Sequence, residues 1–278
     1  MEKRVTEKRV TEKRVTEKRV TMNADLAVRA EHPLIAENIT ARIGRRTILH
    51  DIDIVANPGE ILALVGPNGC GKSTLLSVLS GVRAPVSGSV RIGDLDVHRT
   101  DSMALARARS LVTQQNRGDT PFPVREVVEM GRFPWTRTPE ALRSEEIIDA
   151  AIAECDLEDL VERPFSQLSG GQQARVSLAR AMAQDSPVIM LDEPTAALDI
   201  GHTEQVLSIL RRRAAAGATI VLVVHDLSLT AAYADRVAVM KAGRLLETGT
   251  VDEVMTAELL STTYDHPVVV WDHPETGE

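Results

Sequence analysis

Three runs made almost wholly of apolar residues are the most strongly patterned parts of the chain. They cover residues 61–65, 188–191 and 218–224. Runs of this length without alternation are typical of strands that are buried on both faces of a parallel sheet. Residues 203–213 form an expected helix between the second and third runs. The resulting strand–helix–strand order predicts an α/β fold with a parallel-sheet core.

The segments on either side of the first run predict an antiparallel β subdomain. Turns that contain glycine or proline separate these short stretches of strand-forming residues. The expected strands cover residues 34–42, 47–49, 52–54 and 90–92. Near the carboxyl end, residues 237–247 predict a hairpin, and residues 268–271 predict a further short strand.

The pattern becomes helical between about residues 101 and 185. Ser144 is the expected N-cap of one of these helices, because two glutamates and then apolar residues at helical spacing follow it. We therefore expect one domain in which a helical subdomain interrupts the α/β core. Its limits are 22–278 for the domain, about 101–185 for the helical subdomain, and about 33–100 and 186–278 for the core.

The first 21 residues repeat the five-residue unit Thr-Glu-Lys-Arg-Val. A period of five matches neither a helix nor a strand, so no continuous apolar face forms. The segment is predicted to be a disordered extension, either a short tandem duplication or an artificial addition, with Met22 as the more natural start. A basic arm that grips acidic lipid is the alternative, and the Glu in each unit weakens it.

The residues after the first apolar run carry the clearest chemical motif. Residues 66–73 read Gly-Pro-Asn-Gly-Cys-Gly-Lys-Ser, and a helix is expected to resume at Thr74. Strand, G-x-x-x-x-G-K-S and helix form the phosphate-binding P-loop, whose backbone N–H groups and helix start face the phosphates. Lys72 supplies a charge for the β- and γ-phosphates, and Ser73 supplies a hydroxyl ligand for Mg²⁺. A glycine-rich turn that precedes a lysine by chance would not explain the matching flanks, so the chain is predicted to bind ATP or GTP.

Two acids end the second apolar run. Asp192 suits a Mg²⁺ ligand that acts through water, and Glu193 suits a general base that polarises the attacking water. The carboxyl ends of parallel strands are where ligands bind in open α/β sheets. The alternative is that Asp192 and Glu193 have no catalytic role and simply mark the point where the strand reaches solvent. His225 follows the third run, and it is either a donor to the γ-phosphate or an ordinary histidine at a strand end.

A second helix start with anion-binding character lies at Leu-Ser-Gly-Gly-Gln, residues 168–172. Ser169 is the expected N-cap, and the two glycines leave the first N–H groups uncovered. One chain then has two phosphate sites for one nucleotide. Placing the second site against the nucleotide of a neighbour in a two-fold dimer explains both.

Composition narrows the range of functions. Net charge is −8, and residues 1–21 carry eight Lys and Arg against four Glu, which leaves −12 on the rest. Together with 3% aromatic residues, this acidic body argues against a nucleic-acid binder. No apolar run approaches the ~20 residues that span a bilayer, and no signal-peptide core is evident. The two cysteines form no disulfide or metal pattern, so a reducing cytoplasm is expected.

The chain resembles an ABC-type ATPase over about residues 34–264. Four motifs carry the resemblance, in this order: the P-loop, residues 168–172, the strand that ends in Asp-Glu, and His225. The resemblance implies a P-loop NTPase of ABC type. It also implies that Gln114, or Gln115 as a near-equivalent, senses Mg²⁺ and the membrane partner, and that Asp199 belongs to a loop crossing the dimer. In this family two subunits close head to tail over two ATP molecules, and hydrolysis opens them.

The expected site residues fall into three groups. The expected catalytic residues are Glu193, His225 and Gln114. The expected nucleotide-binding residues are Gly66, Pro67, Asn68, Gly69, Cys70, Gly71, Lys72, Ser73, Thr74, Ser169, Gly170, Gly171, Gln172 and Asp199. The expected Mg²⁺ ligands are Ser73, Gln114 and Asp192. The thiol of Cys70 is expected to be reactive, because a helix N-terminus favours the thiolate.

Two positions depart from the family pattern. Ile43 stands where the family usually has an aromatic residue that stacks on adenine, so an apolar or Arg contact would have to substitute. Ala197 stands where Ser is frequent before the Leu-Asp of the dimer-crossing loop.

Residues 130–135, Met-Gly-Arg-Phe-Pro-Trp, are similar to the corresponding stretch of importers of ferric siderophores, haem and cobalamin, with haem importers favoured. The alternative is an ordinary helix–loop segment. The resemblance implies a homodimeric ATPase subunit at the cytoplasmic face of the membrane, with two separate permease subunits and, indirectly, a substrate-binding protein. A non-transport ABC ATPase, such as an iron–sulfur assembly component, and a small-molecule kinase are the competing functions.

Overall fold

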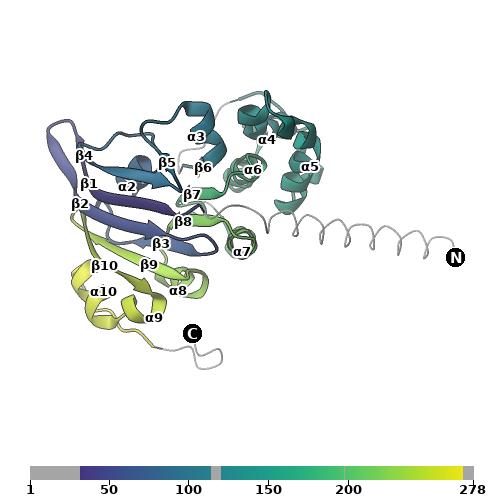
Figure 1. Ribbon diagram of the computed structural model, residues 1–278. Coiled ribbons are helices and arrows are strands. Elements are labelled where there is room, and N and C mark those ends of the chain that lie inside the picture. The colour runs from purple at the N-terminus through teal and green to yellow at the C-terminus, as the bar shows by residue number, and fades with distance from the viewer. Residues whose placement is uncertain (1–31, 114–119, 197, 272–278) are drawn as a thin grey trace.

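The computed structural model describes residues 32–113, 120–196 and 198–271, whose strands form two sheets (Figure 1). The larger sheet has six strands in the order β10-β9-β3-β8-β7-β6. They are β3 (Ile61–Val65), β6 (Arg109–Val112), β7 (Val188–Asp192), β8 (Thr219–Val223), β9 (Arg236–Lys241) and β10 (Arg244–Thr250). Neighbouring strands are parallel except β9 and β10, which form the predicted hairpin. Every residue of β3, β7 and β8 is buried, as the apolar runs predict.

The smaller sheet is antiparallel and has the order β2-β1-β4-β5. Its strands are β1 (Leu34–Ile43), β2 (Arg46–Ala56), β4 (Ser87–Ile92) and β5 (Leu95–Asp96). The two strands expected at 47–49 and 52–54 are one continuous strand, in which Asp51 has a φ of +52°. The predicted antiparallel subdomain is confirmed.

The helix after the P-loop, α2 (Lys72–Leu79), packs between the two sheets (Figure 1). Its Leu75, Leu76 and Leu79 are fully buried against apolar side chains of both sheets. Burial of one such side chain contributes about 1.5–3 kcal/mol. Because α2 is held on both sides, the loop that precedes it has a fixed position.

The second core lies on the opposite face of the larger sheet, under α7 (Ile200–Ala215), and continues into a helical region formed by α4 (Val124–Glu129), α5 (Ser144–Glu154) and α6 (Gly170–Ala183). In Figure 1 these three helices stand together at one end of the molecule. The remaining helices are α3 (Ser102–Ala108), α8 (Leu227–Tyr233), α9 (Val251–Val254) and α10 (Ala257–Tyr264). The 3-10 helices are η1 (Met130–Trp135), η2 (Pro139–Arg143), η3 (Glu158–Leu160) and η4 (Phe165–Gln167).

Three local expectations were wrong. Strand β6 lies inside the segment expected to be helical and pairs with β7 at the edge of the core sheet. Ser144 is the first residue of α5 rather than its N-cap, and its hydroxyl accepts a hydrogen bond from Arg132 at 3.2 Å. Residues 268–271 form no strand, because the N–H of Val268 donates to the Ser261 hydroxyl at 2.8 Å.

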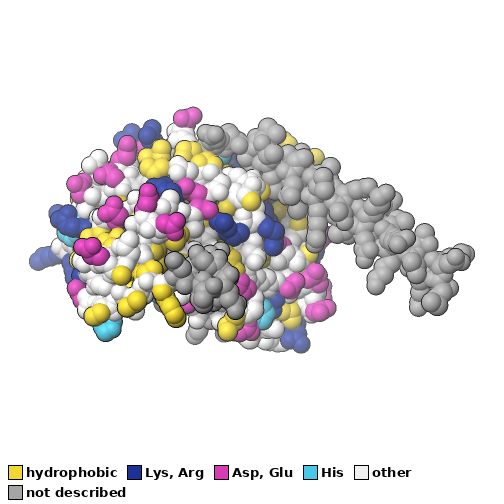
Figure 2. All heavy atoms as spheres, turned by 90° about the horizontal axis from the view of Figure 1, so that it is seen from below, with side chains coloured by type: hydrophobic (Ala, Val, Ile, Leu, Met, Phe, Trp, Pro, Cys, Tyr) yellow, Lys and Arg dark blue, Asp and Glu magenta, His cyan; other side chains and the backbone are white. Residues whose placement is uncertain are grey.

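Among the described residues, no helix is both long and apolar enough to cross a membrane. On the face drawn in Figure 2, Lys and Arg side chains are interspersed with Asp and Glu and form no basic stripe.

Candidate functional site

The chemistry-bearing side chains lie at the carboxyl ends of three adjacent strands, β3, β8 and β7. The P-loop follows β3, His225 follows β8, and Asp192 and Glu193 stand at the end of β7. Asp192 pairs in register with Val223, the last residue of β8. Residues far apart in the sequence are thereby brought to one edge of the sheet.

The backbone conformation requires glycine at two positions of the P-loop. Gly66 has a φ of +145°, and a Cβ atom there would lie 2.1 Å from the carbonyl oxygen of Met240. Gly71 has a φ of +114°, and a Cβ there would lie 2.9 Å from a methyl carbon of Leu49. At Gly66 any other residue would push the loop away from the backbone of β9, whereas at Gly71 the positive φ rather than the contact with a flexible side chain requires glycine.

The turn between β9 and β10 supports the P-loop, which the sequence alone did not indicate. The N–H of Gly243 donates to the carbonyl of Cys70 at 2.8 Å, and the carbonyl of Gly243 accepts from the N–H of His50 at 2.9 Å. A Cβ at Gly243 would lie 2.0 Å from the carbonyl oxygen of Ile48. The only advance signal was a glycine in the turn of a hairpin, which did not reveal the partner.

The start of α2 has the properties of an anion site. No side chain caps it, and its first turn contains no acid. In contrast, aspartate side chains cap α3, α7 and α8. The first N–H groups of a helix have no partner within it, and the helix dipole adds positive potential there. An uncapped start that follows a glycine-rich loop suits a phosphate group.

Lys72 places a buried positive charge inside the loop. Its side chain is 5% exposed, and its ammonium group donates to the carbonyls of Gly66 at 2.6 Å and Pro67 at 3.2 Å. The charge is therefore held beside the N–H groups at the start of α2.

Ser73 and Asp192 bring two oxygen donors together. The Ser73 hydroxyl donates to Oδ1 of Asp192 at 3.2 Å. Burial raises the pKa of the Asp192 carboxyl, whereas the hydrogen bond from Ser73 and the charge of Lys72 act in the opposite direction. A hydroxyl and a carboxylate are ligands that Mg²⁺ prefers, and a cation would offset the cost of burying the carboxylate. The donor set therefore fits Mg²⁺.

Glu193 and His225 form a hydrogen-bonded pair between their carboxylate and imidazole groups. Glu193 is largely buried and has a φ of +51°, and its N–H donates to the carbonyl of Val223 at 3.1 Å. A left-handed conformation at a non-glycine residue is strained, and such strain often marks a functional position. The histidine fixes the direction in which the carboxylate points.

A family model described as ABC transporter matches residues 49–196, which contain the P-loop, the start of α6 and the end of β7. This chain belongs to the ABC transporter family. As an ABC-type ATPase, it binds and hydrolyses ATP.

Relatives and solved structures agree with this assignment. Hemin import ATP-binding protein HmuV of Nocardia farcinica (strain IFM 10152) is 49% identical, over 84% of this chain and 81% of that protein. Cobalamin import ATP-binding protein BtuD of Halobacterium salinarum (strain ATCC 29341 / DSM 671 / R1) is 38% identical, over 83% of this chain and 58% of that protein. The dimeric ATP-binding cassette MJ0796, in a post-hydrolysis state bound to ADP and Pi, is 27% identical, with a TM-score of 0.71, over 78% of this chain and 98% of that chain.

The remaining predicted residues of this ABC ATPase lie apart from the P-loop cluster. Ser169 caps α6 as predicted, and its side chain and that of Gln172 form a reciprocal capping box. Asp199 caps α7 and accepts from the N–H of His202 at 2.9 Å. Figure 1 shows α6 in the helical region, away from α2 between the two sheets. In the described part of the chain, these residues bond their own helices rather than the P-loop.

Other expectations have different outcomes. Gln114, Gln115 and Ala197 lie outside the described residues. Ile43 ends β1 opposite Arg46 and is 48% exposed, so it is available for an apolar contact.

The expected activation of Cys70 was wrong. The thiol is only 5% exposed, and burial raises its pKa above the ordinary value, although the charge of Lys72 acts in the opposite direction. The thiolate therefore forms at a higher pH than in an exposed cysteine.

We expect alkylation of Cys70 by N-ethylmaleimide to be slow at pH 7, to accelerate only as the pH rises above the ordinary pKa of a thiol, and to be prevented by MgATP. The loss of ATP binding and the mass of the adduct would be followed together in a Cys155→Ser chain, with Cys70→Ser as the control. Rapid labelling at pH 7 would contradict a buried Cys70 thiol with a raised pKa. Labelling unaffected by MgATP would contradict the position of Cys70 in the nucleotide site.

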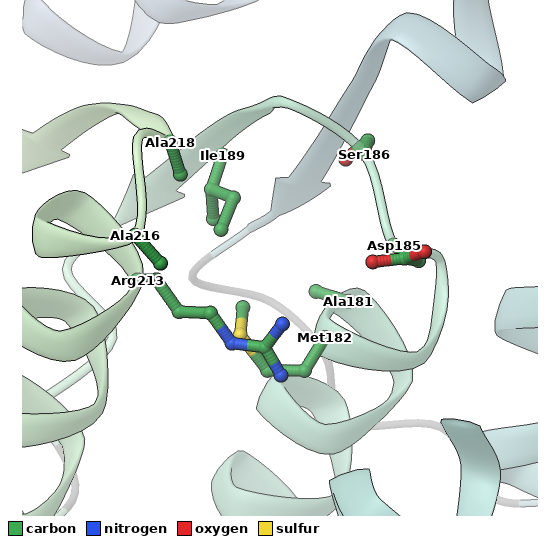
Figure 3. Close-up of a pocket in the computed structure, with 8 residues that line it drawn as sticks. All are labelled: Ala181, Met182, Asp185, Ser186, Ile189, Arg213, Ala216 and Ala218. Atoms are coloured by element: carbon green, nitrogen blue, oxygen red, sulfur yellow. The ribbon is translucent and has the colours of Figure 1, made fainter. Parts of the chain in front are cut away.

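A small pocket between the ends of α6 and α7 lies away from this site. It is lined by Ala181, Met182, Asp185, Ser186, Ile189, Arg213, Ala216 and Ala218 (Figure 3). Ile189 belongs to the start of β7, whereas Asp192 is at its end. The pocket therefore takes no part in the nucleotide chemistry described above.

Proposed function

We propose that this chain is the ATP-hydrolysing subunit of an importer for haem or a related iron chelate. The observation that carries the cargo assignment is the 49% identity over most of both chains with a relative named as a hemin import ATP-binding protein. Further relatives at 46% identity, from Rhodococcus jostii (strain RHA1) and Streptomyces coelicolor (strain ATCC BAA-471 / A3(2) / M145), carry the same name. Cobalamin or ferric siderophore import is the second candidate, because a relative at 38% identity is named for cobalamin import.

The site residues have separate tasks in hydrolysis. Backbone N–H groups among residues 68–74 and the ammonium group of Lys72 hold the β- and γ-phosphates. Ser73 and Asp192, with Gln114, would hold Mg²⁺, which neutralises phosphate charge when bound. Glu193 accepts the proton of the attacking water, and His225 orients Glu193 and donates towards the γ-phosphate. The contacts of Lys72, Ser73, Asp192, Glu193 and His225 support these roles, whereas Gln114 lies outside the described residues.

The starts of α2 and α6 favour a shared site. The start of α2 has no side-chain cap, whereas the start of α6 is capped by its own Ser169 and Gln172 and has no acid in its first turn, and the two starts lie in different regions of one chain. In the proposed dimer, Ser169–Gln172 and Asp199 of one copy complete the site around the P-loop of the other. A twofold arrangement forms two equivalent sites in this way. The similar cassette MJ0796 was solved as a dimer, which supports this arrangement.

The proposed assembly includes two membrane-spanning permease subunits and, through them, a substrate-binding protein. The chain would then lie at the cytoplasmic face of the membrane, and residues 101–185 would form the subdomain that meets the permease. Met130 and Phe133 of η1 are 44% and 64% exposed, although both are large apolar residues. They are suitable contacts for a helix of the permease.

Reconstitution into liposomes tests the cargo directly. The chain would be combined with permeases for haem, for cobalamin or for a siderophore, each with its binding protein and cargo. We expect the haem system to stimulate ATP hydrolysis and to accumulate haem inside the liposomes. Stimulation only by the cobalamin or siderophore system would favour the second candidate. Isolation from native cells without any membrane partner would contradict a role in transport.

A further inference from the structure

The segment Gly131–Arg132–Phe133–Pro134–Trp135 is mostly buried, although the same 3-10 helix η1 carries the proposed permease contacts Met130 and Phe133. Arg132 is 3% exposed, and Gly131 and Pro134 are also buried. A Cβ at Gly131 would lie 2.2 Å from the carbonyl oxygen of Arg180 in α6. Only Phe133 and its neighbour Met130 present large apolar side chains outward. Most of the segment therefore has a task inside the protein.

Arg132 joins three elements through one guanidinium group. Its NH1 donates to the carbonyl of Ala183 in α6 at 3.0 Å, its NH2 to the carbonyl of Glu140 in η2 at 3.2 Å, and its Nε to the hydroxyl of Ser144 in α5 at 3.2 Å. The group also stacks over the ring of Trp135, 5.3 Å from its centroid. A planar fork with fixed donors suits this task better than a single ammonium group.

Trp135 and Gln184 extend the connection to the core sheet. The indole N–H of Trp135 donates to the carbonyl of Gln184 at 2.7 Å, directly after the end of α6. The side-chain amide of Gln184 donates in turn to the carbonyls of Ala106 and Arg109, the latter at 2.7 Å. Arg109 is the first residue of β6. The end of α6 is thus fastened to η1 on one side and to the edge of the sheet on the other.

The opposite end of α6 carries Ser169 and Gln172. The helix has 14 residues, which corresponds to a length of about 20 Å. A displacement of its first turn therefore reaches the bonded carbonyls of Ala183 and Gln184 through a single rigid element.

We propose that Arg132 and Trp135 are positioning residues that fasten η1 to the end of α6, so that α6 and the outward face formed by Met130 and Phe133 move as one unit. This clamp transmits the motion of the nucleotide site to the permease. The transmission to a permease rests on the proposed function, whereas the rigid connection between η1 and α6 does not.

Two conservative substitutions weaken the contacts of Arg132 and Trp135 and change the rest of η1 little. Trp135→Phe removes the indole N–H and keeps an aromatic ring beside Arg132. Arg132→Lys keeps the charge but cannot reach three acceptors at once. Matched controls are Arg137→Lys and Trp271→Phe, because Arg137 and Trp271 are exposed.

Hydrogen exchange of the whole chain tests the rigid connection without any partner. In the wild-type chain and both controls, we expect amides of residues 130–136 and 180–184 to open with equal protection, as one cooperative unit. In Arg132→Lys and Trp135→Phe, we expect residues 130–136 to lose protection about five-fold while residues 180–184 keep it. Equal protection of both segments in both variants would overturn the proposal.

Transport assays with the reconstituted complex test the consequence. We expect the two variants, without the permease, to hydrolyse ATP within about two-fold of the wild-type rate. In the complex, cargo transported per ATP hydrolysed should fall about five-fold. An unchanged ratio of cargo transported to ATP hydrolysed would overturn the proposal. Equal losses of the transport rate and the ATPase rate, together with a lower Tm, would also overturn it, because Arg132 and Trp135 would then have only a structural role. If no permease stimulates ATP hydrolysis by the wild-type chain, the proposed function is contradicted instead. Hydrogen exchange would still decide whether η1 and α6 are rigidly connected.

Discussion

Replacing Glu193 with glutamine is expected to lower the rate of ATP hydrolysis at least about 100-fold and to leave ATP binding intact. Glutamine has the same shape as glutamate and can still accept a hydrogen bond from His225, which the Glu193 carboxylate contacts in the wild-type protein. It cannot accept a proton from the attacking water. A 100-fold loss corresponds to about 2.7 kcal/mol of transition-state stabilisation.

The variant should also accumulate a dimer with bound ATP, because the step that opens the dimer is blocked. Single-turnover hydrolysis and gel filtration with MgATP measure the two effects. Glu204→Gln is a matched control, because Glu204 also accepts a side-chain hydrogen bond, from Tyr233, but lies on α7. A hydrolysis rate near that of the wild type would remove Glu193 from the role of general base.

Replacing Lys72 with alanine is expected to weaken ATP binding about 10- to 100-fold. The ammonium group is the charge that the P-loop holds beside the start of α2, and hydrogen bonds to charged groups contribute about 1.5–3 kcal/mol. The substitution also leaves the carbonyls of Gly66 and Pro67 without their Lys72 donor. Binding therefore loses both a phosphate contact and part of the loop's own support.

Titration with a fluorescent ATP analogue measures this loss, and the Tm reports whether the fold is retained. Arg99→Ala removes an equal charge from a highly exposed position and should bind ATP like the wild type. An unchanged affinity of the Lys72→Ala chain would contradict a role of this charge in nucleotide binding.

The pattern of apolar residues was sufficient for the core of the fold. Strands β3, β7 and β8 are buried on both faces, so a run of almost wholly apolar residues marks each of them. Strand β6 was missed because it is short and begins with Arg109, and pairing with β7 rather than its own sequence makes it a strand. Its pattern alternates between half-buried and buried positions because it lies at the edge of the sheet.

The motifs indicated which residues carry chemistry but not how the protein holds them. The spacing of residues 66–73 identified a P-loop, yet the support from Gly243 depends on a turn about 170 residues later. Proximity to a helix start suggested an acidic thiol at Cys70, whereas burial has the larger effect on its pKa. Ser144 was a plausible cap, but it is the first residue of α5, and its hydroxyl bonds Arg132 of η1, 12 residues earlier. Contacts between residues distant in sequence decide each of these cases.

The central claim is that two copies of the chain share each nucleotide site, the P-loop from one and Ser169–Gln172 from the other. Two inactive variants can test it when mixed. Lys72→Ala disables the P-loop. Gly170→Asp puts a negative charge at the start of α6 and should not disturb the fold, because a Cβ there meets no atom within 4 Å.

The most direct measurement is the ATPase rate of an equimolar mixture of these two variants, compared with each variant alone. In a mixed dimer, one site combines both defects and the other combines an intact P-loop with an intact start of α6. Half of the dimers are mixed, so we predict about one quarter of the wild-type rate, far above either variant alone. A mixture no more active than the sum of the separate variants would contradict a shared site.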